Sequence, residues 1–188
     1  MSFIEGETLE AVWTTLSPRQ KGHLRDQLDV MLTDLHQQRP PEGALLGTLA
    51  PPQVCKDARQ WIRKAENIEN EASFNQFLIR DPLPNIASTY LQWLRSRKRD
   101  DHCIVLSHGD FHSKNILVQV EGESACISGI IDWEMGGWYP EYWDALKALN
   151  LRATNDESDW WLYLPKQLDA FTAEIALDGI VERTITGL

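Results

Sequence analysis

The hydrophobic period of this chain changes near residue 104 and changes back after residue 132, and this change constrains the fold most. Before it, apolar residues recur at helical spacing, as in the series Leu24, Leu28 and Leu32. Within it, β-branched residues form short runs, and the turn sequence Glu121–Ser124 joins the last two of them into a predicted β-hairpin. The runs are 104–106, 116–120 and 125–131. Helical spacing then returns, so the order of elements predicts a mainly helical α+β fold.

The predicted helices can be placed by their caps and apolar spacing. Apolar residues fall at helical spacing from Thr8, and Ser17 followed by Pro18 and Gln20 is typical of a capped helix start. The helix that begins there is amphipathic and is predicted to end near His36. Four further helices are predicted, near 71–79, 84–97, 140–150 and 158–177; residues 1–7 are predicted to be strand-like, 39–52 a loop and the end of the chain, to Leu188, a loose tail.

Length and composition predict one soluble, cytoplasmic domain over residues 1–188. The formal net charge of −10 argues against a nucleic-acid partner, which would require a basic surface. Three cysteines without metal-ligand spacing fit a reducing compartment. The N-terminus lacks the features of a signal peptide, and no apolar run reaches the ~18 residues of a membrane span.

Three polar residues with side-chain carbonyl oxygens lie next to the predicted strands. Asp110 comes after the run 104–107, Asn115 precedes the hairpin, and Asp132 ends it. A carboxylate can accept the proton of an acceptor hydroxyl, and a carboxamide with a second carboxylate can hold the Mg²⁺ ions that bridge the phosphates of ATP. Each residue taken alone is more often a turn former or part of a solvated edge. Their combined spacing favours phosphate transfer.

The motif is His-Gly-Asp, four variable residues, Asn, an apolar strand, a hairpin and Ile-Asp-Trp-Glu. It resembles the pattern of the aminoglycoside phosphotransferase and choline kinase family, whose fold resembles that of protein kinases. The matching positions are His108, Gly109, Asp110, Asn115, Ile116, Leu117, Ile131, Asp132, Trp133 and Glu134. The similarity covers most of residues 1–150, and the segment 137–144 is most like fungal members. The resemblance implies a kinase-like C-terminal lobe in which the short hairpin carries the metal site.

The resemblance also implies roles for individual residues. Asp110 would be the catalytic base, and Asn115 and Asp132 would bind the metal ions and, through them, ATP. Two residues are grouped with the catalytic set: His108, expected to have a structural role in its loop, and Glu134, expected to join the second metal shell.

Three more residues complete the implied set. Asp144 would brace the catalytic loop from below. His112 would contact phosphate or pack. Ile4 lies in the segment that resembles the hinge between the two lobes and is a nucleotide-binding candidate.

One departure from the kinase pattern is large. No Gly-x-Gly precedes Asp110, and no apolar strand there carries a lysine, although both normally hold the phosphates of ATP. The expectation is that the N-terminal nucleotide lobe is absent, that residues 1–7 are a remnant of the hinge, and that this chain alone is weakly active or inactive. The surface that normally meets that lobe would be exposed and could mediate self-association.

The acceptor and the function class each leave alternatives open. Aromatic residues close in sequence to carboxylates suit a small cationic acceptor with a hydroxyl group, but the interpretation that most of the tryptophans among them are core is favoured. They are Trp133, Trp138, Tyr139, Trp143, Trp160 and Trp161, with Glu134, Glu141, Asp156, Glu157 and Asp159. A non-catalytic kinase-like binding module is the main alternative function. A metal-dependent hydrolase is disfavoured, because the five histidines are scattered.

Overall fold

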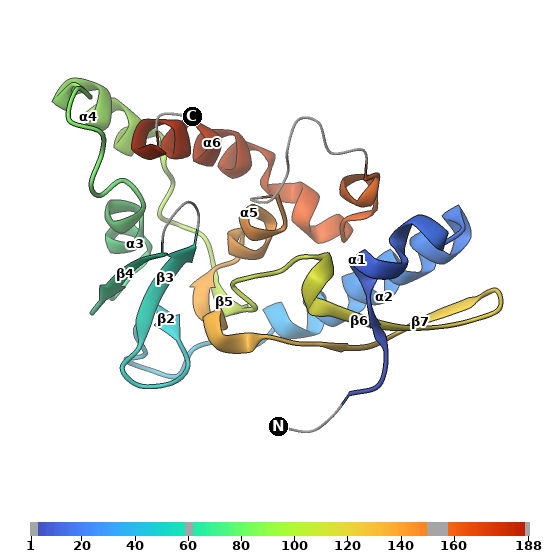
Figure 1. The fold of residues 1–188 in the computed structure, drawn as a ribbon. Coiled ribbons are helices and arrows are strands. Elements are labelled where there is room, and N and C mark those ends of the chain that lie inside the picture. The colour runs from blue at the N-terminus through green and yellow to red at the C-terminus, as the bar shows by residue number, and fades with distance from the viewer. Residues whose placement is uncertain (1–3, 59–61, 150–157, 187–188) are drawn as a thin grey trace.

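The computed structural model describes residues 4–58, 62–149 and 158–186 (Figure 1). Three small sheets carry the strands, in the orders β1-β6-β7, β2-β8-β5 and β3-β4, and all pairs are antiparallel. The strands are β1 (Glu7–Thr8), β2 (Gly47–Thr48), β3 (Val54–Ala58), β4 (Ile62–Glu66), β5 (Ile104–Ser107), β6 (Ile116–Glu121), β7 (Ser124–Ile130) and β8 (Gly137–Pro140). The helices are α1 (Leu9–Val12), α2 (Pro18–His36), α3 (Glu71–Leu78), α4 (Ser88–Arg97), α5 (Trp143–Leu149) and α6 (Thr172–Thr186). The predicted α+β class is confirmed.

The longest helix, α2, forms where its capping sequence predicts it. The Ser17 hydroxyl accepts from the Gln20 backbone N–H while the Gln20 side chain accepts from the Ser17 N–H, which is a complete capping box. The helix packs its leucines into the main core and contacts β7 through Gln27, whose side chain bonds the backbone of that strand. α2 therefore fixes the β6–β7 hairpin from behind.

The β6–β7 hairpin is the predicted one, and its register matters for the site. Ile116 lies opposite Ile130, with a bulge between Leu117 and Val118. Gly122 takes a positive φ in the turn, as a tight hairpin connection requires. The open end of this hairpin brings the residues before β6 next to those after β7.

Several elements differ from the sequence-based expectation. Strands β2, β3, β4 and β8 were not predicted. The sequences of β3 (Val-Cys-Lys-Asp-Ala) and β4 (Ile-Arg-Lys-Ala-Glu) have no apolar alternation. Asp57 holds this hairpin through two ion pairs: its buried carboxylate contacts Arg63 of β4 and, 90 residues away in the sequence, Lys147 of α5. α4 begins at Ser88, four residues later than predicted.

The C-terminal region also differs from its prediction. The expected helix at 158–177 is replaced by two 3-10 turns, and α6 then runs from Thr172 to Thr186, so the predicted loose tail is wrong. Pro165 separates the two turns, because proline has no N–H to continue the first of them.

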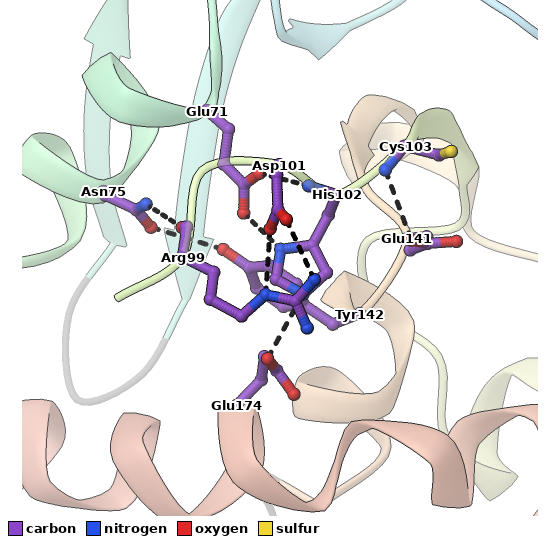
Figure 2. Close-up of polar contacts among 9 residues, drawn as sticks. All are labelled: Glu71, Asn75, Arg99, Asp101, His102, Cys103, Glu141, Tyr142 and Glu174. Carbon is purple, nitrogen blue, oxygen red and sulfur yellow. Dashed lines mark hydrogen bonds and ion pairs between the residues drawn. The ribbon is translucent and has the colours of Figure 1, made fainter. Parts of the chain in front are cut away.

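The start of β5 is fixed by a buried polar network (Figure 2). Glu71 of α3 accepts from the backbone N–H of His102 at 2.9 Å and lies 2.7 Å from its Nδ1. On the other side of the ring, Glu174 of α6 lies 3.2 Å from Nε2. Tyr142 contributes its hydroxyl to Asn75, and burial raises the Tyr142 pKa well above the usual value, so it remains a neutral donor. His102, two residues before β5, is therefore held by α3 and α6.

Two further features of the fold concern the thiols and the helices. Cys55, Cys103 and Cys126 are all free thiols. None of the described helices is long and apolar enough to cross a membrane.

Candidate active site

The loop that carries Asp110 packs tightly against the turn that follows Asp132. Gly109 has a φ of +78°, and a Cβ at this position would lie 2.4 Å from the main-chain oxygen of Met135. Only glycine fits here, since another residue would be both strained and in collision. The two polar loops are thereby held in direct contact.

A fully buried carboxylate braces this loop from below. Asp144 of α5 accepts the backbone N–H of His108 at 3.1 Å and that of Gly109 at 2.9 Å. Its Oδ2 also lies 3.4 Å from Nε2 of His36, at the end of α2. The brace sets the direction in which the chain enters Asp110.

His108 is structural in its contacts. Its Nδ1 accepts the backbone N–H of Asp110 at 3.3 Å, so the ring proton is on Nε2, which donates to the main-chain oxygen of Ile131 at 2.8 Å. The ring is buried, and both nitrogens are engaged. His108 ties the loop to the strand that leads to Asp132.

Asp110 has two side-chain partners on one of its oxygens. Nε2 of His112 lies 3.2 Å from Oδ2, and Nδ2 of Asn115 donates to the same atom at 3.1 Å. The contact with His112 is the main reason that the Asp110 pKa lies below its usual value, and the hydrogen bond from Asn115 acts in the same direction. Asp110 is therefore ionised near neutral pH, and both of these contacts are on Oδ2, not on Oδ1.

The metal-ligand candidates Asn115 and Asp132 lie at the open end of the β6–β7 hairpin. The N–H of Ile131 donates to the main-chain oxygen of Asn115 at 2.8 Å, so Asp132 follows directly after the residue paired with Asn115. Asp132 is exposed and has φ 63° and ψ 57°, the left-handed region that is costly for a residue with a Cβ. Such strain is typical of functional sites.

The donor chemistry of this pair fits Mg²⁺. Nδ2 of Asn115 points to the main-chain oxygen and Oδ2 of Asp110, so its Oδ1 is turned the other way. A carboxamide oxygen and a carboxylate are hard ligands, and Mg²⁺ takes few of its ligands from protein. The described residues contain no cluster of three His, Cys, Asp or Glu side chains that could hold a metal by themselves. Substrate phosphates and water would have to complete the coordination.

The remaining predicted residues occupy the edge of the site or lie outside it. Glu134 is exposed on the turn after Asp132. Its main-chain oxygen accepts from Nζ of Lys56 at 3.1 Å, a contact from β3 that sequence reasoning missed because β3 itself was missed. Ile4 packs over Gly129 of β7 and is 38% exposed. The structure places Asp110 and Asn115 in direct contact. Ile4 has no described contact with either of them.

Three of the six aromatic residues expected near a cationic acceptor are buried in the core. Tyr139 and Trp143 are fully buried and stack at 5.5 Å, and the cation over the Trp143 ring is Lys147 of the protein itself, 4.2 Å away. Trp160 is also buried. Trp133 differs, because it is 41% exposed and packs edge-on against His108. Two of the expected carboxylates, at 156 and 157, lie outside the described residues.

This geometry can be compared with known proteins. The model of the phosphotransferase enzyme family, abbreviated APH, matches residues 1–174. The chain belongs to this phosphotransferase family. The match includes the loop 108–115, the β6–β7 hairpin, the brace at Asp144 and the first residues of α6. No curated protein matches the chain.

Proposed function

We propose that this protein transfers the γ-phosphate of Mg²⁺-bound ATP to a hydroxyl group of a small molecule. The observation that carries the proposal is the arrangement of Asp110, Asn115 and Asp132: one carboxylate oriented by two side chains, beside a carboxamide and a second carboxylate on adjacent ends of one hairpin. Membership of the phosphotransferase family supports the reaction class.

In this proposal each residue has one task. Asp110 orients the acceptor hydroxyl through Oδ1 and accepts its proton as the oxygen bonds to the γ-phosphorus. The bond from that phosphorus to the oxygen of the leaving ADP breaks in the same step. Asn115 and Asp132 hold Mg²⁺, which neutralises the charge of the phosphates. Asp144 and His108 keep the loop fixed, so that little reorganisation is needed during the reaction.

The acceptor is proposed to be small and cationic. The exposed carboxylate of Glu134 and the exposed face of Trp133 stand beside Asp132 and could attract an amine through charge and cation–π contact. We further propose that turnover by these 188 residues alone is weak, because the sequence before Asp110 has no glycine-rich loop. The lysine of β3, Lys56, directs its ammonium to the main-chain oxygen of Glu134.

Calorimetric titration of ATP into the purified chain tests the proposal, with and without Mg²⁺. We expect binding that requires Mg²⁺ and that Asp132→Ala weakens at least ~10-fold, or ~1.4 kcal/mol. Asp110→Asn should bind as the wild type does but transfer phosphate ~10²–10⁴-fold more slowly to acceptor or water. The exposed Asp101→Ala is the matched control. Equal weak binding with and without Mg²⁺ would show that the proposed metal role is wrong.

A further inference from the structure

A continuous segment of this acidic chain is free of acidic residues. The chain has 28 Asp and Glu against 18 Lys and Arg, yet residues 82–99 contain no carboxylate and four basic side chains. These are Arg95, Arg97, Lys98 and Arg99. The segment includes all of α4 and the turn that follows it. It is therefore a local basic site on a protein of net charge −10.

α4 is held to the rest of the protein by a narrow strip and exposes aromatic residues. Leu94 is its one buried residue, and Leu91 is half-buried. Tyr90 is 39% and Trp93 47% exposed, with ring centroids 5.6 Å apart. Arg97 follows Trp93 by four positions and Tyr90 by seven, so the three side chains share one stripe of the helix. Exposed aromatic residues beside arginine are typical of the centres of protein interfaces.

The second half of α2 carries a face of the opposite kind. Residues 26–38 contain three aspartates, at 26, 29 and 34, and no lysine or arginine. Val30 is 63% and Met31 39% exposed on the same helix. Asp26 is paired with Arg25, and the carboxylate of Asp29 accepts the backbone N–H of Gln167. Asp34 is exposed, and the described residues give its carboxylate no partner.

The two faces are complementary in charge, and both expose apolar side chains. Four of the nine exposed large apolar residues in the described part of the chain lie on them: Val30, Met31, Tyr90 and Trp93. One face is aromatic and basic, and the other is aliphatic and acidic. In Figure 1 α4 lies at the edge of the molecule beside α6, away from α2, so one copy does not join its own two faces.

We propose that the basic aromatic face of α4 docks on the acidic face of α2 in a second copy of the chain. Tyr90 and Trp93 cover Val30 and Met31, and Arg97 approaches Asp34. A second copy fits better than an anionic membrane, because the net charge of −10 opposes adsorption to a negative surface, whereas the complementary acidic helix is part of the chain itself. The contact joins two different faces, so it closes into a two-fold dimer or adds further copies.

Sedimentation velocity tests this assembly over a hundredfold range of concentration around ~10 µM, the range of weak protein interfaces. At about 0.15 M salt the Debye length is ~8 Å, so contact charges act while the long-range repulsion of two acidic proteins is screened. We expect concentration-dependent association that Trp93→Ser weakens at least ~10-fold. Leu162→Ser, at an exposed apolar site outside both faces, should leave it unchanged.

Charge reversal gives the decisive comparison. Arg97→Glu and Asp34→Arg should each weaken association, and the double variant should restore it with the pair inverted. The double variant changes the charge by −2 and +2, so its net charge stays at −10 and the rescue is local. Lys64→Glu changes an exposed lysine of β4 and controls for the change in net charge that Arg97→Glu also makes. Thermal unfolding of each variant confirms that it is folded.

Three results would overturn the proposal, and none of them bears on phosphate transfer. The first is a wild-type protein that is monomeric at every concentration. The second is association that survives these changes but is lost in Trp133→Ser, which would assign it to the face beside the metal turn. The third is a monomer that floats with phosphatidylserine vesicles through Trp93, which would assign α4 to a membrane surface.

Discussion

The brace at Asp144 leads to a quantitative prediction about the catalytic loop. Its carboxylate accepts two buried backbone N–H groups, at 3.1 and 2.9 Å, and is itself fully buried. In Asp144→Ala both N–H groups lose their partner, and an unsatisfied buried donor costs ~1–3 kcal/mol, so the loss should be ~2–6 kcal/mol. Asp144→Asn keeps one acceptor oxygen and turns an NH₂ towards the other donor, so it should lose about half of that. Against a total stability of ~5–15 kcal/mol, both changes are large.

Urea unfolding followed by tryptophan fluorescence measures this loss, and hydrogen exchange locates it. We expect the midpoint to fall with an unchanged slope, and the amides of residues 108–110 to exchange faster than those of α2. The control is Asp101→Asn, at an exposed carboxylate paired with Arg99, which should leave the midpoint where it is. An Asp144→Asn protein within ~0.5 kcal/mol of the wild type, with the loop amides still protected, would refute the view that this carboxylate positions the loop.

Three further predictions concern the core, the thiols and the metal turn. Asp57→Asn should cost ~3–5 kcal/mol in urea unfolding, because it leaves a buried lysine and a buried arginine without their counter-ion. Burial raises the pKa of Cys55 to about 12, so at pH 8 a thiol reagent should titrate Cys103 and Cys126 in the native protein and Cys55 only after unfolding. Asp132→Gly should unfold at a urea concentration equal to or above that of the wild type, since glycine relieves the left-handed backbone, and yet lose Mg²⁺-dependent ATP binding; a clear fall in stability would contradict the strain argument.

Sequence reasoning located the elements whose signals are local. The capping box at Ser17 and the alternation before and after the turn at Gly122 depend on neighbouring residues, and both α2 and the β6–β7 hairpin formed as predicted. The β3–β4 hairpin was missed because its stability comes from Asp57, which reaches Lys147, 90 residues away. No local pattern reports such a contact. The same miss concealed Lys56, which reaches the turn after Asp132.

The site residues show the same difference between features set by neighbouring residues and features set by the whole fold. The proximity of Asn115 and Asp132 could be predicted, because the β6–β7 hairpin alone brings its first and last residues together, and Asp110 is close to Asn115 in the sequence. The contact of His112 with Asp110 could not be predicted, because the direction of the imidazole ring depends on the folded loop. The tryptophans were ambiguous for a different reason: burial depends on the whole fold, and it placed Trp143 and Trp160 in the core while leaving Trp133 at the edge of the site.

The charge of the site explains why a metal ion would be required for the proposed reaction. Asp110, Asp132 and Glu134 place carboxylates on two loops that are in direct contact, on a protein of net charge −10. A nearby cation, Lys56, points its ammonium at a main-chain oxygen, and His112 faces Asp110. At ~5 Å each pair of like charges costs ~1 kcal/mol in water and ~3 kcal/mol at an effective dielectric constant of 20. The phosphates of ATP would meet several such pairs at once. A divalent ion held by Asn115 and Asp132 would supply the positive charge that offsets this repulsion. Nucleotide binding by this chain should therefore depend on Mg²⁺ before any chemistry begins.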